Sequence, residues 1–370
     1  MADLGVYLHV PFCRQRCDYC AFATYSDRDH LMRRYLEACR LEVRRAVAAR
    51  ELVPATSIFV GGGTPSRVPA EWLCDVLSDL PRQPGAEVTV ECNPEDVDAA
   101  RLAAYREAGV TRISIGVQST VAHVLGALGR RHGSEQARSA AEMIVDAGFA
   151  TWNADLIFGA ASEDDDDWRR CLDEVLSWPV PPPHLSAYAL TVEPGTPLAR
   201  SPGRHPDEDA QARRYTTTEE VLSAAGYRWE EISNWARPGH GCRHNQLYWR
   251  QGDYLGIGSA AHSHRDGRRW WNVRTPDRYV DAISSGRSPV AGEEHLTADQ
   301  RAFERLTLAL RTPAGVPATC LPGPDEAPEL GPLVDVSGGR AVLTVRGRLL
   351  ANEVCARLRT PHGVPVSSPG

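Results

Sequence analysis

The sequence predicts an α/β protein, a partial (β/α)6 barrel of the TIM type with a small C-terminal α+β domain. Six β-type runs alternate with six helical runs up to about residue 228, which is typical of a parallel sheet with right-handed crossovers. Polar residues and glycines follow the predicted strands, where the sites of barrels lie. The alternation then stops, and a proline-dense stretch precedes a short strand and helix. A doubly wound sheet fits the alternation equally well.

Hydrophobic periodicity places each element. The clearest helix is 29–50, where Met32, Tyr35, Leu36 and Cys39 recur on one helical face. The predicted strands are 6–10, 57–60, 87–91, 112–117, 151–158 and 185–190. The helices predicted to follow them are 29–50, 69–78, 98–107, 134–147, 163–177 and 207–225.

The pattern changes after residue 228. Residues 234–276 are rich in Trp, Tyr, His and Gly, and 297–310 has helical periodicity. Residues 313–332 are dense in proline and predict a loop, whereas 341–358 predicts a strand and a helix. We therefore expect a barrel over 1–230, an aromatic and histidine-rich connecting region over 231–290, and a C-terminal domain over 291–370. A winged-helix-like arrangement is one form that this last domain can take.

Composition limits the functions that are open to the chain. A net charge of −7 argues against general nucleic-acid binding, and no apolar run is long enough to predict a membrane span. All 41 basic residues are arginine, which excludes lysine-dependent Schiff-base enzymes and P-loop nucleotidases. The N-terminus carries no secretory pattern, so we expect a cytoplasmic protein whose ten cysteines are reduced thiols or metal ligands.

Three of the cysteines, Cys13, Cys17 and Cys20, crowd together directly after the first predicted strand. Three thiolates on one loop can hold one soft metal centre. A zinc ion would need a fourth ligand, for which His9 is available. An iron–sulfur cube on three cysteines would instead keep one iron open for another ligand. Three buried thiols without a metal are the remaining alternative.

Glycines and charged residues follow other predicted strands. The run Gly61–Gly63 would let the backbone approach a ligand, although a tight turn is the simpler explanation. Glu91 and Asp155 lie near strand ends and could accept from an ammonium group or from ribose hydroxyls; a helix cap or a salt bridge is as good an expectation for either. Arg130 could bind a carboxylate, but a single arginine more often lies on the surface.

Together these segments resemble the radical S-adenosylmethionine (SAM) superfamily, and more closely its oxygen-independent coproporphyrinogen III oxidase group. The resemblance covers residues 4–311 and, more weakly, the C-terminal end. Besides the cysteine triplet it rests on YLHVPFC at 7–13, GGGTPS at 61–66, ECNP at 91–94, SIGVQS at 114–119 and NADLIFG at 153–159.

The resemblance implies a radical SAM barrel with a [4Fe-4S] cluster on Cys13, Cys17 and Cys20 and SAM at the open iron. It places Tyr19 beside the adenine. The other implied SAM contacts are Tyr7, Gly62, Gly63, Thr64, Glu91, Gln118, Arg130, Asp155, Ile157 and Ala189. A reductant such as flavodoxin or ferredoxin would be a partner.

Two features separate the branches of this group. The decarboxylating oxidases carry a further cysteine two places after the triplet, where this chain has Phe22. The pattern His-Asn-x-x-Tyr-Trp is a hallmark of the heme-chaperone branch, and here it is formed by His244, Asn245, Tyr248 and Trp249. The resemblance therefore implies heme binding through these residues and delivery to a heme-accepting protein. Peripheral contact with a membrane-bound acceptor is compatible with this function. Oxidative decarboxylation of coproporphyrinogen III is the alternative function.

The residues of the aromatic region suit a porphyrin in physical terms. Histidine is a common axial ligand of heme iron, and the thiolate of Cys242 is a rival ligand. Tyr254, Trp270 and Trp271 could supply flat walls, and Arg243 or Arg250 could meet propionates. An aromatic cluster that closes an incomplete barrel is the alternative explanation.

Two segments depart from the family pattern. Ala21 stands where an acidic residue is usual, and Gly159 is followed by Ala160-Ala161-Ser162-Glu163 in place of a Pro-Gly-containing loop. The second departure changes the expected loop over the cofactor but leaves the cluster cysteines untouched.

Overall fold

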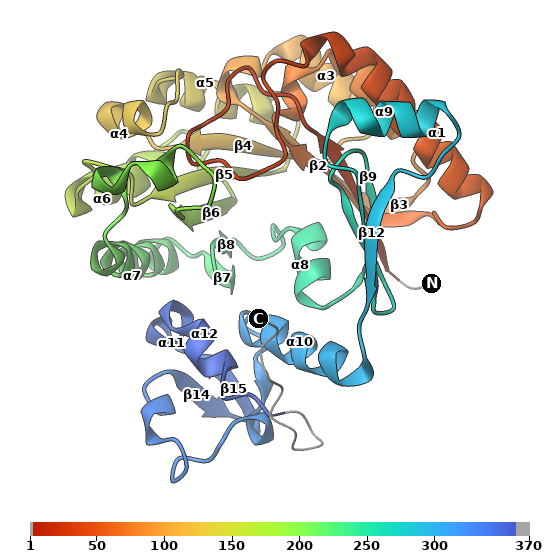
Figure 1. Ribbon diagram of the computed structural model, residues 1–370. Coiled ribbons are helices and arrows are strands. Elements are labelled where there is room, and N and C mark those ends of the chain that lie inside the picture. Colours follow the sequence, from red (N-terminus) through yellow and green to blue (C-terminus); the bar gives the residue numbers. More distant parts are fainter. Residues whose placement is uncertain (1–2, 360–370) are drawn as a thin grey trace.

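The computed structural model describes residues 3–359 and is shown in Figure 1. Its core is a twelve-stranded sheet with the strand order β12-β11-β10-β9-β1-β2-β3-β4-β5-β6-β8-β7. The six strands of the predicted barrel lie in chain order and are all parallel, which confirms the predicted fold class. They are β1 (Leu4–Val10), β2 (Ala55–Gly62), β3 (Arg82–Cys92), β4 (Arg112–Gln118), β5 (Thr151–Phe158) and β6 (His184–Ala189).

The crossover helices cover the convex side of this curved sheet (Figure 1). In α1, the side chains of Tyr35, Leu36, Cys39 and Val43 are buried in the core, as the apolar stripe predicts. The helices are α1 (Met32–Ala48), α2 (Ala70–Asp79), α3 (Ala99–Glu107), α4 (Ala122–Ala127), α5 (Ser134–Asp146), α6 (Asp165–Leu176) and α7 (Glu208–Ala224). Short 3-10 turns lie at Asp29–Leu31, Pro65–Arg67, Pro94–Asp96, Leu198–Arg200 and Pro202–Arg204. The short helix α4 was not expected from the sequence.

The aromatic region extends the sheet at both edges. β8 pairs antiparallel with β6, whereas β9 pairs parallel with β1, and β10, β11 and β12 continue as antiparallel strands. These elements are β7 (Arg228–Glu231), β8 (Asn234–Ala236), α8 (Arg243–Trp249), β9 (Asp253–Ile257), β10 (His262–Arg265), β11 (Arg268–Asn272), α9 (Pro276–Ser284) and β12 (Val290–His295). The region thus lines the open side of the barrel, where α8 lies (Figure 1).

The C-terminal unit has its own small hydrophobic core, which includes Leu310, Val316, Leu343 and Val354. It consists of α10 (Ala298–Leu310), β13 (Val316–Pro317), β14 (Val334–Ser337), β15 (Arg340–Leu343), α11 (Val345–Leu349) and α12 (Ala351–Cys355), with 3-10 turns at Ala318–Cys320 and Pro328–Leu330. Its three strands form an antiparallel sheet of order β13-β15-β14. The three-part division at residues 230 and 290 stays a prediction.

No helix within residues 3–359 is both long and apolar enough to cross a membrane.

Candidate functional site

The loop after β1 brings the three predicted cluster cysteines to one cavity. Cys13, Cys17 and Cys20 all line a space of about 480 Å³ at the C-terminal ends of the barrel strands. Backbone hydrogen bonds close the loop at its base, from Cys13 N to Tyr25 O at 3.0 Å and from Tyr25 N to Pro11 O at 2.8 Å. The loop is therefore anchored on both sides of the triplet.

Three thiols on one loop are a donor set that an iron–sulfur cube can use. Cys13 is buried and the other two thiols are half-buried. Within residues 3–359, no group of three Cys, His, Asp or Glu side chains is already arranged around a single point as in a bound metal ion's site. A cube takes each of three thiolates on a different iron and leaves the fourth iron open. Burial raises the pKa of Cys13 to about 11, so a positively charged centre is what would hold it as a thiolate.

The same cavity collects almost all of the residues that the family resemblance assigns to SAM. They come from the C-terminal ends of five neighbouring strands, from the cysteine loop and, for Arg130, from the loop between α4 and α5. Those that line it are Tyr19, Gly62, Gly63, Thr64, Glu91, Gln118, Arg130, Asp155, Ile157 and Ala189. Tyr7 is the exception, because its side chain lines a second cavity. The assignment of these residues to SAM stays a prediction.

The glycine run at the end of β2 is required by close packing. A Cβ on Gly63 would lie 2.8 Å from the Phe12 carbonyl oxygen, and one on Gly62 would lie 2.6 Å from the His9 ring. A Cβ on Gly61 would lie 3.0 Å from Oε2 of Glu91. Three glycines therefore let β2 approach the cysteine loop and the carboxylate at once, which a tight turn alone would not demand.

Two half-buried carboxylates, Glu91 and Asp155, face the cavity without a cation. The Gly62 amide donates to Glu91 at 3.2 Å, while Asp155 accepts from Ser114 Oγ at 3.0 Å and from Asn153 Nδ2 at 2.8 Å. Neither carboxylate forms an ion pair within the described part of the chain. Burial and the nearby Asp155 raise the pKa of Glu91 to about 8, and burial also raises the pKa of Asp155. The site thus favours a ligand with a positive charge.

Arg130 is half-buried and points into the same cavity, so it is not a surface arginine. Its guanidinium donates to Tyr19 OH at 3.3 Å and to Asn93 Oδ1 at 3.4 Å. Its buried Nε has no hydrogen-bond partner in the structure. An unpaired buried donor at a cavity wall marks a place for a ligand oxygen.

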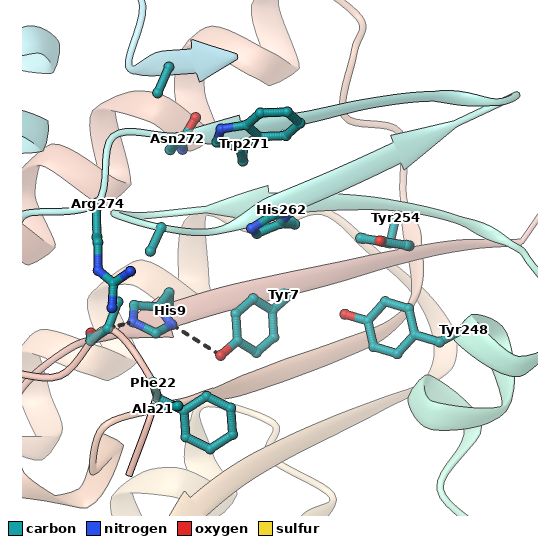
Figure 2. Close-up of a pocket in the computed structure, with 13 residues that line it drawn as sticks. Tyr7, His9, Ala21, Phe22, Tyr248, Tyr254, His262, Trp271, Asn272 and Arg274 are labelled. Carbon is teal, nitrogen blue, oxygen red and sulfur yellow. Dashed lines mark hydrogen bonds between the residues drawn. The ribbon is translucent and has the colours of Figure 1, made fainter. Parts of the chain in front are cut away.

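A second cavity, of about 630 Å³, lies against the first, because Ala21 and Phe22 line both. Figure 2 shows its walls. Its labelled lining residues are Tyr7, His9, Ala21, Phe22, Tyr248, Tyr254, His262, Trp271, Asn272 and Arg274. They come from β1, the cysteine loop, α8 and the strands β9–β11 with the residues that follow β11. Aromatic rings and imidazoles therefore form most of the walls, and we call this space the aromatic cavity.

Only one residue of the predicted heme motif reaches this cavity. Tyr248 lines it, whereas His244, Asn245 and Trp249 do not. His244 is buried, its Nδ1 lies 3.0 Å from Ser57 Oγ, and its Nε2 lies 2.9 Å from Tyr248 OH. Burial lowers the pKa of His244 to about 3, so the ring is neutral.

Of the other residues suggested for heme, Tyr254 and Trp271 line this cavity, whereas Trp270, Cys242, Arg243 and Arg250 do not. The Cys242 thiol is buried 3.6 Å from Glu87, and Arg243 donates to the Gly85 carbonyl at 2.6 Å. The Arg250 guanidinium donates to the Gln246 carbonyl. His262 and Arg274 also line the cavity, and no sequence pattern predicts a role for either. Recognition of β10 and β11 as paired strands would have placed His262 opposite Trp271.

The chain is similar in sequence to proteins of a known family. The model of the radical SAM superfamily matches residues 7–175. The "Heme chaperone HemW" of Mycobacterium tuberculosis (strain ATCC 25618 / H37Rv) is 42% identical over 370 residues, which cover 96% of this chain and 94% of the relative. That of Escherichia coli (strain K12) is 37% identical over 312 residues, 82% of this chain and 81% of the relative.

A solved structure shares the fold. The coproporphyrinogen III oxidase HemN of Escherichia coli, described as a radical SAM enzyme, matches with a TM-score of 0.81 at 22% identity. The match covers 96% of this chain and 89% of that one. From the sequence relatives, this chain belongs to the heme chaperone HemW family, within the radical SAM superfamily.

Proposed function

We propose that this protein is a heme chaperone that binds heme in the aromatic cavity and transfers it to an acceptor protein. We further propose that it carries a [4Fe-4S] cluster and SAM in the neighbouring cavity. The observation that carries the proposal is the contact between the two cavities at Ala21 and Phe22. One cavity is rich in thiols and charged groups, and the other is lined by aromatic rings and histidines, which suits a flat porphyrin.

The thiol-rich cavity suits SAM in its charges. Cys13, Cys17 and Cys20 would hold the cluster, and reductive cleavage of SAM is the chemistry that the cluster supplies when bound. The carboxylates of Glu91 and Asp155 would accept from the ammonium group and the ribose hydroxyls. The guanidinium of Arg130, which has an unpaired buried Nε, would meet a carboxylate. These roles follow the resemblance residue by residue.

Phe22 argues for heme delivery over porphyrinogen decarboxylation. It occupies the position of the oxidases' further cysteine, and the residue is 69% exposed at the junction of the cavities. A phenyl ring cannot bind iron or donate a hydrogen atom as a thiol does, but it can pack against a porphyrin face. The printed names of the relatives support the same choice.

The partners follow from this function. They are heme, a heme-accepting protein, and a reductant such as flavodoxin or ferredoxin; peripheral contact with a membrane-bound acceptor belongs to the same proposal. Ten free thiols support a reducing, cytoplasmic location.

Two parallel assays test the function. The anaerobically reconstituted protein is incubated with ferric heme, and separately with coproporphyrinogen III, SAM and a reductant. We expect stoichiometric heme binding and no release of carbon dioxide. Turnover of coproporphyrinogen III without heme binding would replace the chaperone function by the oxidase function.

A further inference from the structure

The histidines around the aromatic cavity differ in whether their ring nitrogens are free. His9 uses both nitrogens, with Nδ1 3.1 Å from Tyr7 OH and Nε2 3.0 Å from the Ala23 carbonyl. His244 also uses both, and it lies buried behind the wall. His262 lines the cavity, is exposed to it, and forms no hydrogen bond through its ring within residues 3–359. A nitrogen must have a free lone pair to bind iron.

We propose that His262 supplies the axial nitrogen to the iron of a heme bound in the aromatic cavity, and that His244 is a positioning residue for Tyr248. This assignment rests on the proposed heme function and deepens it. The role of the His-Asn-x-x-Tyr-Trp motif changes accordingly. Its histidine, His244, holds the cavity-lining Tyr248 in place, and the iron ligand, His262, comes from β10.

Strand pairing fixes the orientation of the His262 ring. His262 lies opposite Trp271 in the antiparallel pair of β10 and β11, and the two rings stack with centroids 5.7 Å apart at an angle of 26°. The Trp271 ring in turn covers Gly292 of β12, where a Cβ would lie 2.6 Å from the indole. The imidazole is therefore held in place by packing while its nitrogens stay free, as metal ligation requires.

The cavity has a positively charged side chain at one end and tyrosine rings at the other. Figure 2 shows Arg274 at one end, Tyr248 and Tyr254 at the other, and His262 between them. The Arg274 guanidinium is exposed and forms no ion pair in the described part of the chain. Heme carries its iron at the centre and its propionates along one edge. A heme ligated by His262 would direct that edge to Arg274 and its apolar edge to the tyrosines.

His244 acts on this cavity through Tyr248. Its Nε2 holds the tyrosine hydroxyl at 2.9 Å, and the Tyr248 ring meets the Tyr254 ring edge-on with centroids 4.5 Å apart. Loss of His244 would release the Tyr248 ring but would leave the His262 nitrogens untouched. The two histidines should therefore give different defects.

Ferric heme titration with spectroscopy of the axial ligand tests this assignment. We compare the full-length native protein with His262→Ala, His244→Ala and the control His295→Ala, whose side chain is 68% exposed on β12. Visible absorption and electron paramagnetic resonance report the ligand, and circular dichroism reports the fold. We expect His262→Ala to lose the imidazole-ligated spectrum, to bind heme about tenfold more weakly or worse, and to regain the spectrum with added imidazole.

The other variants make the test specific. His244→Ala should bind more weakly but keep the native ligand spectrum, and His295→Ala should match the native protein. Arg274→Gln should weaken binding of heme but not of its dimethyl ester, which lacks the propionate charges. A native ligand spectrum in His262→Ala would overturn the assignment while leaving the heme function intact. A native protein that binds no heme would overturn both.

Discussion

The Nε2 atom of His244 lies 2.9 Å from the hydroxyl oxygen of Tyr248, one turn further along α8. Of this pair, only Tyr248 reaches the aromatic cavity. The opposite nitrogen of His244 lies 3.0 Å from Ser57 of β2, and its ring stacks on Phe59 with centroids 5.4 Å apart. The imidazole thus joins α8 to the sheet and fixes one wall of the cavity.

Removal of this imidazole should destabilise the fold. His244→Ala leaves a cavity in the core and two hydroxyls without their partner, so we expect the free energy of unfolding to fall by about 2–4 kcal/mol. Chemical denaturation measures it, with the exposed His295→Ala as the control. An unchanged midpoint would contradict the described packing of α8 on β2.

The cluster assignment predicts the result of removing one thiol. Cys17→Ala should abolish the brown absorbance of anaerobically reconstituted protein, because two remaining thiolates cannot hold the cube. Cys74→Ala, which removes a half-buried thiol on α2, is the matched control and should keep its iron and sulfide. Full iron and sulfide in Cys17→Ala would refute the assignment.

The glycine run predicts a steric effect on the same loop. Gly63→Ala would place a Cβ 2.8 Å from the Phe12 carbonyl oxygen, so the cysteine loop must shift. We expect reduced iron incorporation during reconstitution. Gly126→Ala is the control, because nothing lies within 4 Å of its Cβ. Equal iron content in the two variants would show that the close approach has no role in the cluster site.

Glu91 predicts a pH dependence of stability in the protein freed of SAM. Its pKa is raised from 4.5 to about 8, so between these values the native chain keeps a proton that the unfolded chain has lost. The contribution of Glu91 to the free energy of unfolding therefore falls as the pH rises through this window. Glu91→Gln removes this loss.

We expect Glu91→Gln to be more stable than the native chain by about 2 kcal/mol near pH 9, with little difference below pH 4.5 or so. Denaturation at the two pH values measures this, and the exposed Glu135→Gln serves as the control. Equal stability of Glu91→Gln and the native chain near pH 9 would show that the carboxylate is not buried without a cation.

Arg348 forms one of the contacts that join the C-terminal unit to the barrel. Its guanidinium donates to Glu219 of α7 at 2.5 Å and lies 3.8 Å from the centre of the Trp229 ring. Arg348→Ala should loosen this attachment by about 1–3 kcal/mol and speed proteolysis in the segment between β12 and α10. The exposed Arg346→Ala on the same helix should not, and equal cleavage rates would argue against this contact.

The sequence predicted the barrel well because local patterns encode it. Periodicity on one face identified α1, and strand–helix alternation identified β1 to β6. Strands β9 to β12 were missed because they are short, and because β9 pairs with β1, more than 200 residues away in the chain. Without them, His262 and Trp271 could not be placed on one face.

The two cavities also differ in how well the sequence predicts them. The predicted SAM residues follow strand ends, which parallel pairing gathers at one edge whatever the loops do. The heme motif depends on a long-range contact, since His244 and Ser57 are 187 positions apart. The burial of His244 and the position of Tyr7 in the second cavity both result from long-range packing, which no local sequence pattern encodes.

Heme titration with variants of the cavity wall tests whether heme binds in the aromatic cavity. Ferric heme is added to the native protein, to Trp271→Ala at the wall, and to Trp72→Ala on α2 outside the barrel, and the Soret band is followed. We expect one heme per native chain, weaker binding by Trp271→Ala and native binding by Trp72→Ala. Equal affinity of all three proteins would contradict heme binding in the aromatic cavity.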